Sequence, residues 1–127
     1  METNQKKIKI VYIVLIFLYP LIHCWWGLDL TDSGYNIVNF MQFPKIGSFY
    51  VLSSWLSNAC GRLFMILPGG GSLLGLKIYC SLIVSIVATA SYVYLSRFIS
   101  CHIVFIGILM TLFMGWCPYL SIYHYLA

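Results

Sequence analysis

Long apolar runs separated by short polar segments dominate the chain, at residues 8–26, 49–67, 73–95 and 103–119. A helix needs about 20 mostly apolar residues to cross a hydrocarbon layer about 30 Å thick. The first, third and fourth runs therefore predict membrane-spanning helices. We expect a single all-α polytopic transmembrane domain over residues 1–127, with three spans, or four if residues 49–67 also cross.

The first run is flanked by residues that anchor helices at membrane interfaces: Lys6, Lys7, Lys9, Trp25 and Trp26. A cleaved signal peptide is the alternative. However, the run is long for one, and His23-Cys24-Trp25-Trp26 lacks the small residues of a cleavage site. We predict an uncleaved anchor with the N-terminus in the cytoplasm and residues 27–72 outside.

Residues 49–67 carry a polar stripe at helical spacing, formed by Ser53, Ser54, Ser57, Asn58, Gly61 and Arg62. Such a stripe suits a helix lying in the membrane interface, or one that lines a wet cavity. We predict an interfacial helix over 49–67, preceded by a shorter one over 35–43. Because the count of basic residues slightly favours a fourth span, that alternative stays open. Residues 68–71 read Pro-Gly-Gly-Gly, which breaks the chain before the next span.

The later two spans carry small residues every four positions, namely Ser81, Ser85 and Thr89, then Gly107, Thr111 and Gly115. Small side chains let helix backbones approach each other closely within lipid. We therefore expect both spans to pack against other helices. Lys77 lies near the outer end of its span, where its long side chain can extend to the interface.

Composition supports a membrane protein, because 61% of the residues are hydrophobic, 8% are charged and the mean hydropathy is +0.92. A soluble domain has about 25% charged residues, so a soluble enzyme is excluded. No basic patch interleaved with aromatic residues indicates nucleic acid. The five cysteines and three histidines show no metal-ligand spacing, so we predict neither a metal nor a cofactor.

Beyond the N-terminal tail the only acidic residues are Asp29 and Asp32, directly after the first span. One interpretation is structural, with Asp32 or Ser33 as the N-cap of the helix over 35–43. The other is catalytic, with one carboxylate acting at the membrane face as a general base toward a hydroxyl within hydrogen-bond reach. The spacing alone does not decide between them.

The order of these segments resembles the N-terminal part of the GT-C superfamily of membrane glycosyltransferases. The closest likeness is to its dolichyl-phosphate-mannose mannosyltransferase-like and bacterial lipid A or polysaccharide glycosyltransferase branch. Asp32-Ser33-Gly34-Tyr35 matches the first and last positions of that family's Asp-Glu-x-Tyr motif. Leu73-Leu74-Gly75-Leu76-Lys77 is similar to its Leu-Gly-Leu-Arg opening of the second span. Ser33 departs from the family's glutamate, which puts a paired carboxylate in doubt.

The resemblance implies an inverting transfer of a sugar from a polyprenyl-phosphate donor to an acceptor hydroxyl on the extracytoplasmic face. Asp32 would be the base, with Asp29 second, and Tyr35 would orient the site. Stabilising the leaving phosphate needs cations, and the outer-side candidates are Arg62, Lys45 and Lys77, with plain interface anchors as the alternative interpretation. Because members of the family have many more spans, this chain would be an N-terminal fragment, inactive alone, whose partners are further transmembrane helices. A bacterial inner membrane is expected, with the endoplasmic reticulum as the alternative.

Two other classes compete with this interpretation. A small multipass protein without catalysis, such as a lipid-linked-sugar flippase accessory or an assembly subunit, would use the small-residue faces to bind partner helices. A secondary transporter fragment would require ionisable or helix-breaking residues near mid-span, and the predicted spans carry almost none.

Overall fold

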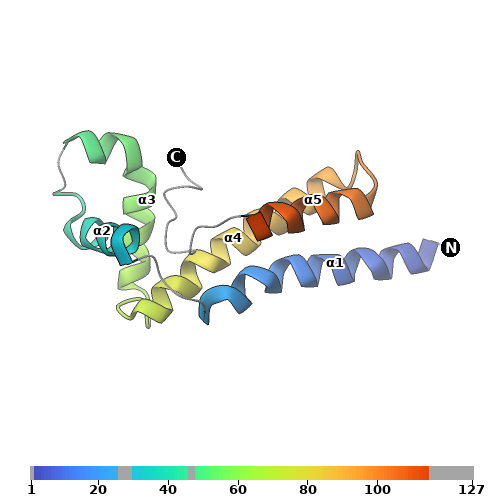
Figure 1. Ribbon diagram of the computed structural model, residues 1–127, viewed down its shortest axis with the longest axis horizontal. Helices are drawn as coiled ribbons and strands as arrows, with labels where there is room; N and C mark the ends of the chain where they lie inside the picture. Colours follow the sequence, from blue (N-terminus) through green and yellow to red (C-terminus); the bar gives the residue numbers. More distant parts are fainter. Residues whose placement is uncertain (1, 26–29, 46–47, 115–127) are drawn as a thin grey trace. The chain divides into compact units, whose positions relative to one another are not determined.

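The computed structural model describes residues 2–25, 30–45 and 48–114, and within these ranges the chain is helical with no strand (Figure 1). The elements are α1 (Glu2–Ile22), the short 3₁₀ helix η1 (His23–Trp25), α2 (Leu30–Gln42), α3 (Ser48–Ile66), α4 (Leu73–Leu95) and α5 (Cys101–Met114). The all-α prediction is confirmed for this part of the chain. Residues 115–119 of the predicted third span lie outside the described residues.

The chain divides into two compact units, and the division falls inside α4 between Ser81 and Leu82. Among the described residues, unit 1 comprises 2–23 and 82–114, so it contains α1, α5 and most of α4. Among the described residues, unit 2 comprises 24–25, 30–45 and 48–81, so it contains most of η1, all of α2 and α3, and the start of α4.

Polar side chains lie at the helix contacts of unit 1. Ser85 on α4 is fully buried, and its hydroxyl donates to the carbonyl oxygen of Phe17 on α1 at 2.8 Å. The Tyr12 hydroxyl on α1 is 2.8 Å from Nδ1 of His102 on α5. The Tyr12 ring also stacks on Phe105, with 3.9 Å between ring centroids. These contacts join α1 to both of the other helices of unit 1.

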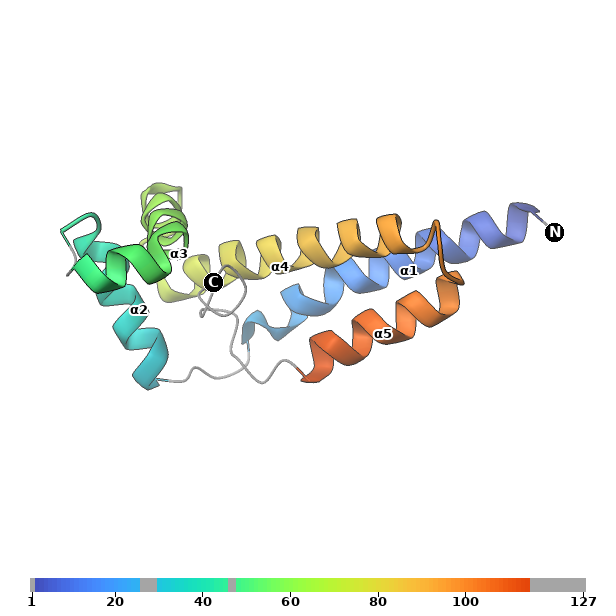
Figure 2. The ribbon, with the colours of Figure 1, turned by 90° about the horizontal axis from the view of Figure 1, so that it is seen from above.

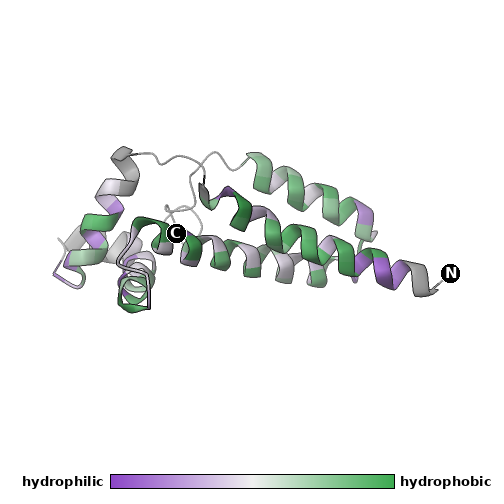
Figure 3. Cartoon of the chain, turned by 90° about the horizontal axis from the view of Figure 1, so that it is seen from below, coloured by the Kyte–Doolittle hydropathy of each residue, from purple (hydrophilic) through white to green (hydrophobic). Residues whose placement is uncertain are grey.

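Most residues of α4, α5 and α1 beyond its basic first turns are apolar (Figure 3), and many of their large apolar side chains are exposed. Ile86 and Val87, near the middle of α4, are 57% and 56% exposed, and Ile10 and Ile106 are exposed to a similar extent. Soluble proteins bury most side chains of this kind. Polar groups at the contacts and apolar groups outside form the arrangement that suits lipid as the solvent.

In unit 2, α2 crosses α3 where the fully buried ring of Phe40 lies against Gly61 (Figures 1 and 2). Phe40 forms a core with Leu76 and Cys80 of α4. The partly buried side chains packed on this core are Ile37, Phe64 and Met65. The core therefore holds α2, α3 and the first turns of α4 together.

The middle of the polar stripe on α3 is buried, which differs from the expectation that the stripe would face the interface or a wet cavity. Ser57 and Asn58 are each 2% exposed, and Gly61 is buried under Phe40. The Asn58 amide donates to the Ser54 hydroxyl at 2.9 Å. The apolar residues of α3, among them Trp55, Leu56, Leu63 and Ile66, are the exposed ones. The stripe therefore serves mainly as a packing face.

A bend interrupts α3 at Ser54, whose φ and ψ angles are −132° and 26° (Figure 1). Sharp helix bends occur at pairs of small residues, and Ser53 and Ser54 form such a pair.

The Pro-Gly turn ends α3 as predicted and starts α4 in a capped form. Gly69 has a φ of +78°, a conformation that other residues rarely adopt. Ser72 is the N-cap of α4, because its hydroxyl accepts from the Gly75 amide at 3.1 Å and also donates to the Gly69 carbonyl oxygen at 2.7 Å. The turn and the cap together fix the direction in which α4 leaves unit 2.

Among the described helices, α4 is the one long and apolar enough to cross a membrane. Its 23 residues extend about 35 Å, which exceeds the hydrocarbon thickness of about 30 Å. The first turns of α1 carry Glu2 and three lysines, so its apolar part is shorter. The described part of α5 has 14 residues, or about 21 Å.

Candidate functional site

The predicted base Asp32 is the third residue of α2, and its side chain lies outside the described set. Asp29, the second candidate, lies outside the described residues altogether. Because α2 begins at Leu30 rather than near residue 35, neither Asp32 nor Ser33 is its N-cap, and that prediction is wrong. A carboxylate in the first turn still interacts favourably with the helix dipole, so a purely structural role for Asp32 remains physically sound.

Tyr35 lies one helical turn after Asp32, on the same side of α2. Its side chain is exposed, as are those of Val38 and Met41, which follow at three-residue steps. Tyr35, Val38 and Met41 thus form an accessible surface, whereas Phe40 is buried against α3 and α4. Asn39, one turn after Tyr35, is also buried. A substrate could therefore reach Tyr35 without any movement of the core.

Arg62 is exposed on α3, next to Gly61 at the helix crossing. Phe40, the residue of α2 at this crossing, follows Asp32 by eight positions, which is about 12 Å along a helix axis. Arg62 and the Asp32 position are therefore at different levels of unit 2. The predicted contact of Arg62 with a substrate phosphate stays a prediction.

Lys77, which the sequence predicts to reach the membrane interface, is buried in the structure, with 5% of its surface exposed. It does not extend outward, which corrects the expectation. Its carbonyl oxygen lies 3.8 Å from Sγ of Cys24, and that thiol also donates to the Ser81 hydroxyl at 3.1 Å. Lys77 is thus at the level of η1, the last described turn before the acidic segment that contains Asp29 and Asp32.

Few residues of the chain carry a negative charge that could balance the ammonium group of Lys77. The whole sequence contains three acidic residues, Glu2, Asp29 and Asp32. A buried ammonium group is costly unless a negative charge or several hydrogen bonds balance it. The sequence already marks Lys77 as an outer-side cation candidate, because a lysine inside an apolar run is a functional candidate by default.

Comparisons with models of known protein families, with curated proteins and with solved structures find no match to this chain. The likeness to membrane glycosyltransferases therefore rests on the motif residues Asp32–Tyr35 and 73–77 and on the order of the segments.

Proposed function

We propose that this chain forms the N-terminal part of a membrane glycosyltransferase that uses a polyprenyl-phosphate sugar on the extracytoplasmic face. In this proposal α1, α4 and α5 cross the inner membrane of a bacterium, with the N-terminus in the cytoplasm. The helices α2 and α3 lie at the outer surface. The observation that carries the proposal is an acidic segment directly after the first apolar helix, followed by a helix pair that packs on the start of α4.

The distribution of polar and apolar side chains in unit 1 supports the proposal that its helices cross a membrane. Ser85 and Tyr12 make their hydrogen bonds between helices, whereas the apolar side chains of α1, α4 and α5 face outward. In water, such a surface would expose far more contiguous apolar area than monomeric proteins tolerate. In lipid it is the ordinary condition of a spanning helix.

The chemistry assigned to Asp32 is general-base catalysis. The carboxylate accepts the proton of the acceptor hydroxyl, whose oxygen then forms a bond to the anomeric carbon of the sugar. The bond from that carbon to the phosphate oxygen of the donor breaks, and the configuration inverts. Tyr35, exposed one turn away on α2, contacts the acceptor.

The departing polyprenyl phosphate carries negative charge, which a cation must stabilise. Lys77 is the best-placed candidate, because it is buried beside η1, where the chain leads into the acidic segment. Within this proposal it either faces the leaving phosphate or balances the aspartates. Arg62 and Lys45 are exposed, and they contribute at the surface.

Replacing Asp32 with Asn in the full-length protein tests the function. We expect transfer of labelled sugar from a polyprenyl-phosphate donor in membranes to fall at least about 100-fold, since a general base contributes roughly 10²–10⁴. Gln42→Ala, at the exposed far end of the same helix, is the matched control and keeps normal transfer. Transfer by Asp32→Asn at the level of this control would remove Asp32 as the base.

A second candidate is a non-catalytic subunit that binds partner helices, and one observation favours it. Gly107 and Thr111 were expected to pack against another helix, yet both are exposed, and a Cβ at Gly107 would meet nothing within 4 Å. The Thr111 hydroxyl donates to the Gly107 carbonyl oxygen of its own helix at 2.9 Å. An open small-residue face of this kind suits helix association.

A further inference from the structure

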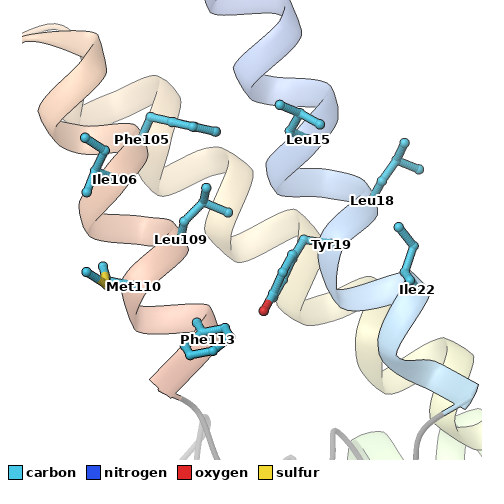
Figure 4. Close-up of a pocket in the computed structure, with 9 residues that line it drawn as sticks. All are labelled: Leu15, Leu18, Tyr19, Ile22, Phe105, Ile106, Leu109, Met110 and Phe113. Carbon is cyan, nitrogen blue, oxygen red and sulfur yellow. The ribbon is translucent and has the colours of Figure 1, made fainter.

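An apolar groove of about 480 Å³ runs between α1 and α5 in unit 1 (Figure 4). In Figure 4, Tyr19 points from α1 toward α5, and Phe105 and Leu109 point from α5 toward α1. Leu15 and Ile22 of α1 and Phe113 of α5 extend the lining. The lining spans eight residues of α1 and nine of α5, a rise of about 10–12 Å, roughly a third of the hydrocarbon layer.

The lining residues indicate what can fill this groove. They are bulky Leu, Ile, Phe, Met and Tyr side chains, without a glycine, alanine or serine. Helices dock on one another in lipid through small residues and hydrogen bonds, and the small residues Gly107 and Thr111 of α5 are not part of the lining. A flexible hydrocarbon chain follows an irregular groove of large apolar side chains better than a second helix does.

One end of the groove leads toward basic residues. Tyr12 stacks on Phe105 and contacts His102 at this end. Lys9 lies one turn before Tyr12 on α1, and Lys7 is eight residues, about two turns, before Leu15. Arg97 is exposed in the turn that precedes α5, five residues before His102.

Positive charge predominates at this end of the groove. Unit 1 contains Lys6, Lys7, Lys9 and Arg97, and the single acidic residue of its sequence is Glu2. Each lysine or arginine near a membrane surface attracts anionic headgroups by about 1 kcal/mol, which corresponds to about fivefold in affinity. The basic end and the apolar groove thus lie next to each other, as the anionic headgroup and the acyl chain do in a phospholipid.

We propose that unit 1 binds an anionic phospholipid, with one acyl chain in the α1–α5 groove and the headgroup beside Lys7, Lys9 and Arg97. The lipid belongs to the leaflet that contacts the N-terminal end of α1. Its chain covers the groove and joins α1 to α5 below the Tyr12–Phe105 stack. This site lies in unit 1 and is independent of the proposed glycosyl transfer.

Native mass spectrometry of the full chain tests this proposal. The protein is reconstituted in bilayers with equal amounts of phosphatidylglycerol and phosphatidylcholine, and the lipid retained after mild detergent extraction is measured. We expect one bound phosphatidylglycerol in preference to phosphatidylcholine. Leu109→Trp fills the groove and should abolish retention, whereas Ile103→Trp, at an exposed position of α5 outside the lining, should keep it.

A charge variant tests the headgroup without changing the groove. The double variant Lys7→Gln and Arg97→Gln should lower the preference for phosphatidylglycerol about fivefold for each charge removed. Circular dichroism shows whether each variant keeps its helix content. Equal retention of the two lipids by the unaltered chain, an unchanged preference in the double variant, or a lipid-free dimer would overturn the proposal.

Discussion

At Gly61, the absence of a side chain allows α2 to cross α3. A Cβ at this position would meet the ring of Phe40, which is fully buried and cannot turn away. Gly107 in α5 offers a matched comparison, because a Cβ there would meet nothing within 4 Å. Both glycines lie inside helices, so the helix-propensity gain from alanine is the same for both.

We therefore expect Gly61→Ala to have a lower free energy of unfolding than Gly107→Ala, by about 1–3 kcal/mol, the usual cost of overpacking. Titration of the full chain from mild detergent into a denaturing one, followed by circular dichroism, gives both values. Equal stability of the two variants would show that Phe40 does not lie on Gly61.

Individual side chains also show which features of burial can be predicted from the sequence. Residue spacing predicted the burial of Ser81 and Ser85, because a run of small residues on an apolar helix has few other uses. It did not predict that Gly107 and Thr111 stay exposed, because spacing defines a face but not the element that covers it. The burial of Lys77 was equally hidden, since burial depends on tertiary packing, and the Cys24 thiol that reaches its carbonyl oxygen is 53 residues away in the sequence.

Among the elements, α4 matches its predicted bounds, residues 73–95, because strong signals mark both ends of its apolar run. Ser72 caps its start, and Arg97 follows its end. The start of α2 was predicted less well. Asp32 and Ser33 are good N-cap residues by type, yet the helix begins at Leu30. Competing polar residues within one turn leave the start of a helix undetermined by sequence alone.

A charge placed on the exposed side of α4 tests whether lipid surrounds it. Val87 is near the middle of this helix and 56% exposed. In a membrane, Val87→Asp costs about 2.5–3.5 kcal/mol at the helix centre, so insertion of the α4 segment in a translocon assay should fall sharply. Tyr94→Asp, exposed near the end of the helix, is the control with a smaller loss.

On the surface of a soluble protein, Val87→Asp would change stability by less than about 0.5 kcal/mol. Equal insertion of the Val87→Asp and Tyr94→Asp variants would therefore remove α4 as a membrane span.

For the whole molecule, the proposed topology follows from the distribution of charge and of apolar surface. Basic residues gather at the start of α1 and in the turn before α5, and the aspartates follow the other end of α1. With α1, α4 and α5 as spans, the acidic segment is outside and Arg97 is in the cytoplasm. If α3 also crosses, Arg97 moves outside. The position of Arg97 therefore distinguishes the two topologies, whereas the acidic segment is outside in both.

The central claim is that an integral membrane protein presents the segment around Asp32 on the extracytoplasmic face, and labelling of single cysteines tests it most directly. In a variant with all native cysteines replaced by alanine, cysteine is introduced at Asn36 or at Arg97, and intact cells receive a membrane-impermeant maleimide. We predict labelling of Asn36→Cys in intact cells and of Arg97→Cys only after permeabilisation. Labelling of Asn36→Cys only after permeabilisation, or release of the protein from membranes by alkaline carbonate, would contradict the account.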